Sequence, residues 1–357
     1  MADVTQARGV AEIIRKASDW ASPRGLDTNS VPWRLWEKAK QNHWDPAVID
    51  FSQDRADWAG LPDEQRLALA GLARGFMVGD EGVTLDILPL VQCMGDLGRV
   101  EDAIYLTSFA YEEAKHVDFF RRWFDEVGID LNEMDELGNR RRAERGLPPI
   151  DRNRQVGLFE RELPRVMRRV QVDRSAEAIL DASVTYNQFV EGCLALAGYK
   201  VWGHMFETFG VMPGLQEGLA HVRVDESRHI TYGTYLARRT IAENPELFDR
   251  ARDRMYELRD GLLAGGGPGA YGGGGAAARG GNGETAHGNG EGHGQGDGQG
   301  NGQGAVVMAP FQKYALDQVE RRVAILAKAV GLSAEDAASG VGAEEAEADA
   351  ESAEVSL

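Results

Sequence analysis

Two short motifs in the sequence each place a carboxylate three residues before a histidine. They are Glu113-Ala-Lys-His116 and Glu226-Ser-Arg-His229. Both lie in stretches with helical hydrophobic periodicity, and side chains three residues apart on a helix project from the same face. One Glu-x-x-His pair alone is unsurprising and is usually a surface ion pair. The same two residue types on one buried face would be metal ligands.

Each motif follows another acid that interrupts an apolar helical stretch. Asp80 lies 33 residues before Glu113, and Glu191 lies 35 residues before Glu226. The chain therefore contains one unit twice, an acid on one helix and Glu-x-x-His on the next. Because burying an unpaired carboxylate costs several kcal/mol, four such acids on apolar faces need a shared partner.

A four-helix bundle with two metal ions in its core supplies this partner. One carboxylate comes from each of two helices, and one Glu-x-x-His pair comes from each of the other two. Oxygen ligands with one imidazole per metal favour iron or manganese over copper or structural zinc. The predicted metal ligands are Asp80, Glu113, His116, Glu191, Glu226 and His229. Asp225, directly before the second motif, is expected to hydrogen-bond a ligating imidazole.

The elements that must position these residues are helices. Hydrophobic periodicity predicts helices over 64–95, 99–127, 151–171, 175–208, 214–242, 246–263 and 310–331, and strand patterns are almost absent. The predicted fold class is all-α. Five segments are expected: an N-terminal arm packing on the body (1–60), the helical metal-binding domain (61–263), a Gly-rich flexible insertion (264–305), a C-terminal helix of the same domain (306–332) and an acidic disordered tail (333–357).

Composition excludes several classes of protein. Of 44 glycines, 20 lie between Gly265 and Gly304. A net charge of −18 without a basic cluster argues against nucleic-acid binding. No apolar run reaches the ~18 residues of a membrane span. The N-terminus does not resemble a signal peptide, and Cys93 and Cys193 match neither a disulfide framework nor a zinc site. We therefore expect a cytoplasmic protein.

The six ligand positions and their intervals resemble the ferritin-like dimetal-carboxylate superfamily, within it the small-subunit branch of ribonucleotide reductases. Tyr-Glu-Glu-Ala-Lys-His116, Ser183-Val-Thr-Tyr-Asn-Gln-Phe-Val-Glu191 and Leu-Ala-Leu-Ala-Gly-Tyr199 are similar to R2-like ligand-binding oxidases. The resemblance implies a ferritin-like helical bundle, one manganese and one iron ion with two irons as the alternative, and a homodimer. It also implies a long-chain fatty-acid-like ligand held near the metals by its carboxylate, with Tyr199 lining the cavity.

The same resemblance implies an ether crosslink between Val83 and Tyr186, formed when the reduced site activates dioxygen. Val83 lies three residues after Asp80 and therefore faces the metals. The first ligand departs from the family, because these oxidases usually have Glu where this chain has Asp80. Glu81 is the neighbouring acid, but adjacent helical positions differ by about 100°. We predict that Asp80 is the ligand, because it shares a face with Val83.

The predicted function is an oxygen-activating oxidase that performs a two-electron C–H oxidation. The first alternative is a ribonucleoside-diphosphate reductase small subunit with a manganese–iron oxidant. Phe120 stands where tyrosine-radical subunits have their tyrosine, but reductases with a manganese–iron oxidant also have Phe there, so this residue excludes only the tyrosine-radical subclass. The acidic tail has no aromatic residue for docking on a large subunit, which argues against radical transfer to a partner. The second alternative is a ferritin-like protein that stores metal or carries a ligand without turnover.

Overall fold

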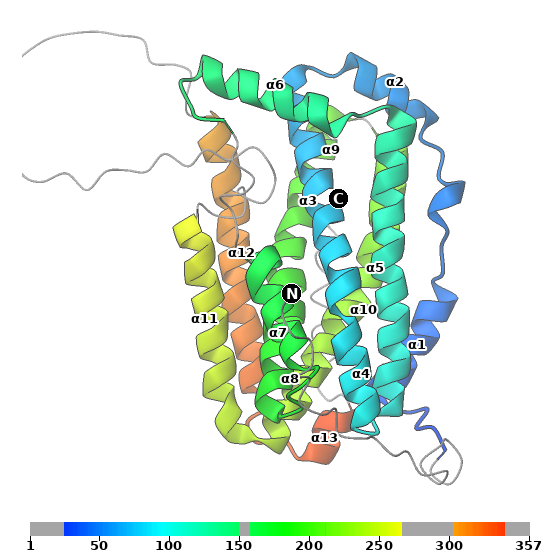
Figure 1. Cartoon of the computed structure of the whole chain (residues 1–357), viewed down its shortest axis with the longest axis vertical. Helices are drawn as coiled ribbons and strands as arrows, with labels where there is room; N and C mark the ends of the chain where they lie inside the picture. Colours follow the sequence, from blue (N-terminus) through cyan, green and yellow to red (C-terminus); the bar gives the residue numbers. More distant parts are fainter. Residues whose placement is uncertain (1–24, 150–157, 211, 266–302, 340–357) are drawn as a thin grey trace, which may run out of the picture.

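The computed structural model describes residues 25–149, 158–210, 212–265 and 303–339, and within these ranges all regular elements are helices. This confirms the all-α prediction. The long helices run along the longest axis of the molecule (Figure 1). They are α3 (Asp63–Asp86), α5 (Val100–Val127), α9 (Leu196–Phe209), α10 (Pro213–Glu243), α11 (Phe248–Gly265) and α12 (Gln303–Ala327).

Shorter helices connect and cover these long ones. They are α1 (Val31–Gln41), η2 (Pro46–Val48), α2 (Ser52–Gly60), α4 (Leu88–Asp96), α6 (Leu131–Glu144), η4 (Leu158–Glu162), α7 (Leu163–Arg169), α8 (Ala176–Ser183), η5 (Val184–Ala195), η6 (Pro245–Leu247) and α13 (Ala334–Ser339). Among the described helices, none is both long and apolar enough to cross a bilayer.

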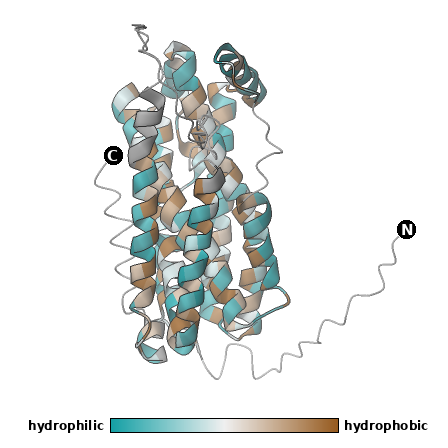
Figure 2. Ribbon diagram, turned by 90° about the vertical axis from the view of Figure 1, so that its left-hand side faces the viewer, coloured by the Kyte–Doolittle hydropathy of each residue, from teal (hydrophilic) through white to brown (hydrophobic). Residues whose placement is uncertain are grey.

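Four elements form the centre of the bundle. Helix α3 packs against α5, and η5 packs against α10. Hydrophobic and hydrophilic residues both occur along the long helices (Figure 2), as expected when one face of each helix is buried and the other meets solvent. The buried faces form two hydrophobic clusters, and all four central elements contribute residues to one or both of them.

The start of α10 is fixed by an acid from a distant element. Asp54 of α2 is fully buried and accepts hydrogen bonds from the backbone N–H groups of Gly214 and Leu215, both at 2.8 Å. The indole of Trp123 donates to the same carboxylate at 3.0 Å. A carboxylate at a helix N-terminus satisfies N–H groups that have no partner within the helix. Asp54 thereby fixes the end of the helix that carries the second motif.

Two helix predictions need correction, and one helix was not predicted. The single helix expected over 64–95 is wrong, because α3 ends at Asp86 and α4 begins at Leu88. Pro89 lies in the first turn of α4. Because proline has no backbone N–H to donate, it is tolerated at the start of a helix but interrupts a continuous one. The segment 175–208 is helical, but its central part, η5, is a π-helix. Helix α6 was not predicted, because each of its residues is partly or fully exposed and no apolar face marks it.

The boundaries near the C-terminus also differ from the prediction. Helix α11 extends to Gly265 and α12 begins at Gln303, so the described ends of the predicted insertion are helical. Residues 334–339 form α13 inside the segment predicted to be a disordered tail. The Ser333 hydroxyl accepts from the N–H of Asp336 at 3.0 Å and caps this short helix. Residues 1–24, 266–302 and 340–357 of the arm, insertion and tail lie outside the described residues.

Candidate metal centre

The six predicted ligands converge in the core between α3, α5, η5 and α10. They form two groups, and within each group the potential ligand atoms all lie within 4.8 Å of one another. One group is Asp80, Glu113, His116 and Glu226, and the other is Glu113, Glu191, Glu226 and His229. Glu113 and Glu226 belong to both groups. Carboxylates in that position can bridge two metal ions.

The two imidazoles face the shared carboxylates. Nδ1 of His116 lies 3.7 Å from Oε1 of Glu226 and 4.0 Å from Oε2 of Glu113. Nδ1 of His229 lies 3.1 Å from Oε1 of Glu113 and 3.8 Å from Oε1 of Glu191. All six side chains are buried, the most exposed being Asp80 at 7%. Its neighbour Glu81 is exposed, so the structure places Asp80, and not Glu81, in the group.

Each of the six side chains has a buried atom without a hydrogen-bond partner among the described residues. These atoms are Asp80 Oδ2, Glu113 Oε2, His116 Nδ1, Glu191 Oε1, Glu226 Oε2 and His229 Nδ1. Buried polar atoms are almost always paired, so six unpaired ones in two adjoining groups call for a partner that the protein itself does not supply. Carboxylate oxygens with one imidazole per group suit iron or manganese. The residues therefore fit a dinuclear metal centre.

The electrostatics of the groups also favour bound cations. Burial, and then repulsion from neighbouring carboxylates, raises the pKa of Asp80, Glu113 and Glu191 well above the usual range. Burial lowers the pKa of His229 to about 4, so its imidazole is neutral at neutral pH. A neutral imidazole is the form that binds a metal, and two cations would offset the repulsion among the acids.

Each imidazole is oriented by the acid that precedes the other motif. With the ring proton on Nε2, His116 donates to Oδ2 of Asp225 at 3.1 Å and His229 donates to Oε2 of Glu112 at 2.9 Å. These bonds leave both Nδ1 atoms facing the two groups, as in metal sites where a carboxylate holds the ligating imidazole. Sequence reasoning placed Asp225 against an imidazole but gave Glu112 no role. The matching position of Glu112, directly before the first motif, was the available signal.

A buried network surrounds these two acids. Arg228 donates to both Glu112 and Asp225. Asp225 also accepts from the Lys115 ammonium and from the Trp44 indole, each at 2.8 Å. Burial alone would raise the pKa of Asp225, but the His116 hydrogen bond and the two cations hold it below the usual range. Burial and the charge on Asp225 raise the pKa of Glu112 to about 7.

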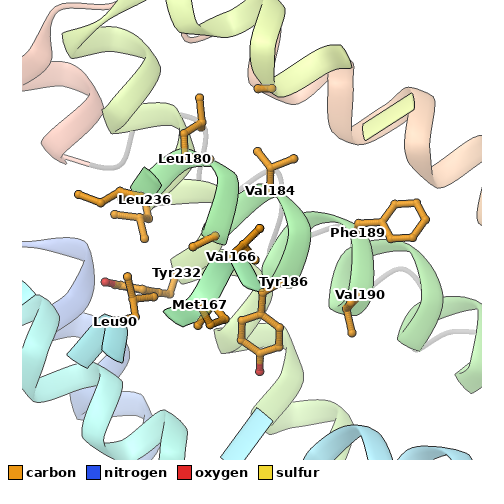
Figure 3. Packing of buried hydrophobic residues seen from close by; sticks show 14 of the residues in the cluster. Leu90, Val166, Met167, Leu180, Val184, Tyr186, Phe189, Val190, Tyr232 and Leu236 are labelled. Atoms are coloured by element: carbon orange, nitrogen blue, oxygen red, sulfur yellow. The ribbon is translucent and has the colours of Figure 1, made fainter. Parts of the chain in front are cut away.

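Tyr186, one residue of the predicted crosslink pair, contacts a shared carboxylate, and Val83, the other, is buried on α3. The Tyr186 hydroxyl donates to Oε1 of Glu113 at 3.1 Å, and Figure 3 shows Tyr186 and Val184 pointing in opposite directions from η5. Val83 is buried three residues after Asp80 and belongs to the same hydrophobic cluster as Tyr186. The segment that carries Tyr186 is π-helical, and such segments occur frequently at functional sites.

A cavity of about 410 Å³ lies between α9 and α10. Its buried wall is mainly apolar and includes Tyr199, Trp202, Phe206 and Leu219, while Arg223 is among its polar residues. Burial raises the pKa of Tyr199 well above its usual range, and the charges of Glu226, Asp80 and Glu113 raise it further.

A bundle of long helices with two buried carboxylate–histidine groups in its core defines the class of ferritin-like dimetal-carboxylate proteins. The family model described as ribonucleotide reductase, small chain matches residues 29–260. The R2-like ligand-binding oxidase from Sulfolobus acidocaldarius is 33% identical, covers 88% of this chain and 97% of its own, and has a TM-score of 0.67. The chain belongs to the ribonucleotide reductase small-chain family and, within it, to the R2-like ligand-binding oxidases.

Two further solved structures carry a metal cofactor. An R2-like ligand-binding oxidase with a glycine replaced by phenylalanine has an anaerobically reconstituted Mn/Fe cofactor. It is 30% identical, covers 86% of this chain and 96% of its own, and has a TM-score of 0.66. A tyrosine-to-phenylalanine variant has an aerobically reconstituted Mn/Fe cofactor. It is also 30% identical, covers 86% and 95%, and has a TM-score of 0.66.

Proposed function

We propose that the protein is an oxidase that holds one manganese and one iron ion and uses dioxygen for a two-electron C–H oxidation. The observation that carries this proposal is the set of six buried, unpartnered ligand atoms in two groups that share Glu113 and Glu226. The Mn/Fe cofactors of related oxidases support the choice of metals. Two iron ions are the alternative occupants.

The roles of the chain's own residues follow from their contacts. Bound manganese and iron would supply Lewis acidity and electrons for dioxygen reduction. Glu113 and Glu226 would hold both ions, and the hydrogen bonds from His116 and His229 to Asp225 and Glu112 fix the two rings. The Phe109 ring stacks on His229 with centroids 3.6 Å apart, and this contact also fixes the orientation of the imidazole.

We further propose that Tyr186 and Val83 form an ether crosslink. The phenol oxygen of Tyr186 would replace a hydrogen of Val83, so the O–H bond and one C–H bond break, one C–O bond forms, and two protons and two electrons pass to the reduction of dioxygen. The bond from the Tyr186 hydroxyl to Glu113 places the phenol next to a shared carboxylate, which can receive its proton. Solved structures of related oxidases include a tyrosine-to-phenylalanine variant and a valine-to-leucine variant, the two residue types of the proposed crosslink.

The cavity between α9 and α10 is proposed to bind the tail of a long-chain fatty-acid-like molecule. Its apolar wall suits an alkyl chain, and the charges of Glu226, Asp80 and Glu113 act on Tyr199, so we place the carboxylate of this molecule on the Tyr199 side of the cavity. The printed name of the relatives, ligand-binding oxidase, supports a small-molecule ligand. Family membership also leads us to propose a homodimer, which light scattering of the purified protein would test.

Aerobic loading with manganese and iron tests the oxidase and the crosslink together. We expect uptake of both metals and the loss of two hydrogens, located by peptide mass mapping to the fragments that contain Val83 and Tyr186. The matched control is Tyr186→Phe, which should load the metals and keep its mass. Full metal uptake with unchanged wild-type mass would contradict the crosslink and favour storage or ligand carrying. Failure to bind either metal would contradict the dimetal proposal.

A ribonucleotide reductase small subunit is the second candidate, favoured by the family match over residues 29–260. Hydrogen bonds link His116 through Asp225 to Trp44, which is 7% exposed, so this route approaches the surface. Binding to a catalytic large subunit, with support of nucleotide reduction, would establish this candidate. The absence of both would remove it.

A further inference from the structure

A chain of aromatic rings leads away from the candidate centre on the side of His229. Phe109 of α5 stacks on His229 at 3.6 Å and lies 6.1 Å from Tyr105, about one helical turn earlier. Tyr105 lies 4.8 Å from Tyr232 of α10, which in turn lies 6.0 Å from Tyr235, all between ring centroids. The rate of electron transfer falls steeply with distance. Successive rings at these separations therefore offer a route of short steps.

Tyr232 differs from Tyr105 in having a base to receive its proton. The Tyr232 hydroxyl donates to Oδ1 of Asp102 at 3.1 Å, and both side chains are buried. The Tyr105 hydroxyl is buried without a hydrogen-bond partner in the described part of the chain. A phenol becomes strongly acidic when it loses an electron, so it needs a nearby acceptor. Tyr232 meets this condition, and Figure 3 shows its side chain pointing in a different direction from Tyr186.

The surroundings of Asp102 keep this acceptor in place. Nε of Arg99 lies 3.5 Å from its second oxygen, Oδ2, so the carboxylate has a cation on one side and the phenol on the other. Burial raises the pKa of Asp102, which makes it a stronger proton acceptor than an exposed aspartate. Tyr232 lies three residues after His229 and Asp102 lies on the helix of the first motif, but the two imidazoles are held by Asp225 and Glu112 and not by this pair.

The far end of the ring chain approaches the surface. The Tyr235 hydroxyl accepts a hydrogen bond from Nη1 of Arg239 at 2.8 Å. Tyr235 is 2% exposed, whereas the Arg239 side chain is 26% exposed. The ring chain therefore ends on a tyrosine whose hydrogen-bond partner is a partly exposed arginine side chain.

We propose that Tyr232 is a redox-active residue that donates one electron to the oxidised metal centre through Tyr105 and Phe109, and its proton to Asp102. This inference rests on the proposed function, which supplies the oxidant: the metal centre after its reaction with dioxygen. In the step, the O–H bond of Tyr232 breaks, the centre is reduced by one electron, and an O–H bond forms on Asp102. The products are a neutral tyrosyl radical and a neutral carboxyl group.

We call this route from Tyr235 through Tyr232 to the metal centre the relay. It lets the oxidised centre be reduced when no C–H bond of Val83 or of a ligand is available for oxidation. A one-electron reductant in solution, donating at Tyr235, returns an electron to Tyr232, and Asp102 returns the proton. The cycle leaves the chain unchanged. Without it, an unspent oxidant would attack the buried side chains around the site.

The test uses the full chain with Tyr186→Phe, which removes the phenol of the proposed crosslink and leaves the oxidant unspent. After aerobic loading with manganese and iron and rapid freezing, electron paramagnetic resonance should show a tyrosyl radical whose spectrum changes with ring-deuterated tyrosine. Adding Tyr232→Phe should abolish this radical. Adding Asp102→Asn should also abolish it, because an amide cannot take the proton.

Tyr256→Phe is the matched control in the same background. Tyr256 of α11 also donates to a carboxylate, Oε2 of Glu320 at 3.0 Å, but it lies near the surface on a helix outside the ring chain. Its replacement should leave the radical yield unchanged. A radical that survives Tyr232→Phe, or one that is lost with Tyr256→Phe, would overturn the assignment to Tyr232.

Metal content and the circular dichroism spectrum of the same samples distinguish a failure of the relay from a failure of the proposed oxidase function. A Tyr186→Phe chain that is helical, binds both metals and reacts with dioxygen, but forms no tyrosyl radical, overturns the relay alone. A helical chain that binds neither metal overturns the proposed function and the relay with it. Tyr232→Phe keeps the ring and its packing and removes only the hydroxyl. If this variant has native helical content but forms no radical, the loss is caused by the missing hydroxyl.

Discussion

At the scale of single residues, the acid that precedes each motif holds the imidazole of the other motif. Glu112 precedes the first motif and contacts His229 of the second, whereas Asp225 precedes the second and contacts His116 of the first. Arg228 donates to both acids, so the two pairs form one buried network. Removing one charge from such a network leaves its partners buried and incompletely paired.

Glu112→Gln should weaken metal binding in the group that contains His229. The amide keeps the shape of the side chain but no longer offers a charged acceptor to the imidazole N–H, and such changes typically lower metal affinity by about 10–100-fold. Chelator competition with purified protein measures the affinity. Glu126→Gln, an exposed position on the same helix, is the control and should bind as wild type. Equal affinities for the two variants would contradict the role of Glu112.

The sequence reveals the six candidate ligands better than the residues that hold them. Helical spacing places Glu113 with His116 on one face, and the repeated interval brings in Asp80 and Glu191. Nothing in that spacing indicates Trp44, which meets Asp225 across 181 residues of chain. Such contacts depend on how helices pack, which hydrophobic periodicity leaves open.

At the scale of elements, η5 and α10 approach each other closely at Gly233. A Cβ added to Gly233 of α10 would lie 1.9 Å from Cβ of Asn187. Asn187 in turn donates to Oε2 of Glu191 at 3.0 Å. Glycine at position 233 therefore lets the π-helical segment lie directly on α10. The position of Glu191 depends on this contact.

Gly233→Ala should destabilise the fold, because the new methyl group must push η5 away from α10. Overpacking of this kind typically costs about 1–3 kcal/mol. Gly261→Ala in α11 is the control: a Cβ there has no described atom within 4 Å, and alanine should stabilise the helix by about 0.5–1 kcal/mol. Denaturant unfolding of both variants measures the difference. A Gly233→Ala protein as stable as wild type would contradict the close contact.

The extent of the helices was largely predictable, and the exceptions have physical causes. Periodicity placed α5 and α10 to within a residue or two. It missed the break at Ile87, although Pro89 was visible in the sequence. It could not find α6, whose partly exposed residues are held to α3 by ion pairs such as Arg74–Asp135 at 3.1 Å. The π-helical geometry of η5 shifts hydrogen bonds by one residue and leaves no mark on residue spacing.

At the scale of the whole molecule, the net charge of −18 conceals where its acids lie. Asp80, Glu113, Glu191 and Glu226 are buried together in the core, where formal counting treats them like surface carboxylates. Bound cations would offset their charge and make the loaded protein less acidic than its composition suggests. The fold brings four elements together around these acids, and its stability should therefore be tied to the metals.

The most direct test of the central claim is a crystal structure of the metal-loaded protein with anomalous diffraction at the manganese and iron edges. The account predicts two metal peaks in the core, one bound by Asp80 and Nδ1 of His116 and the other by Glu191 and Nδ1 of His229. Glu113 and Glu226 should reach both. A single peak, or metals bound away from these six side chains, would contradict it.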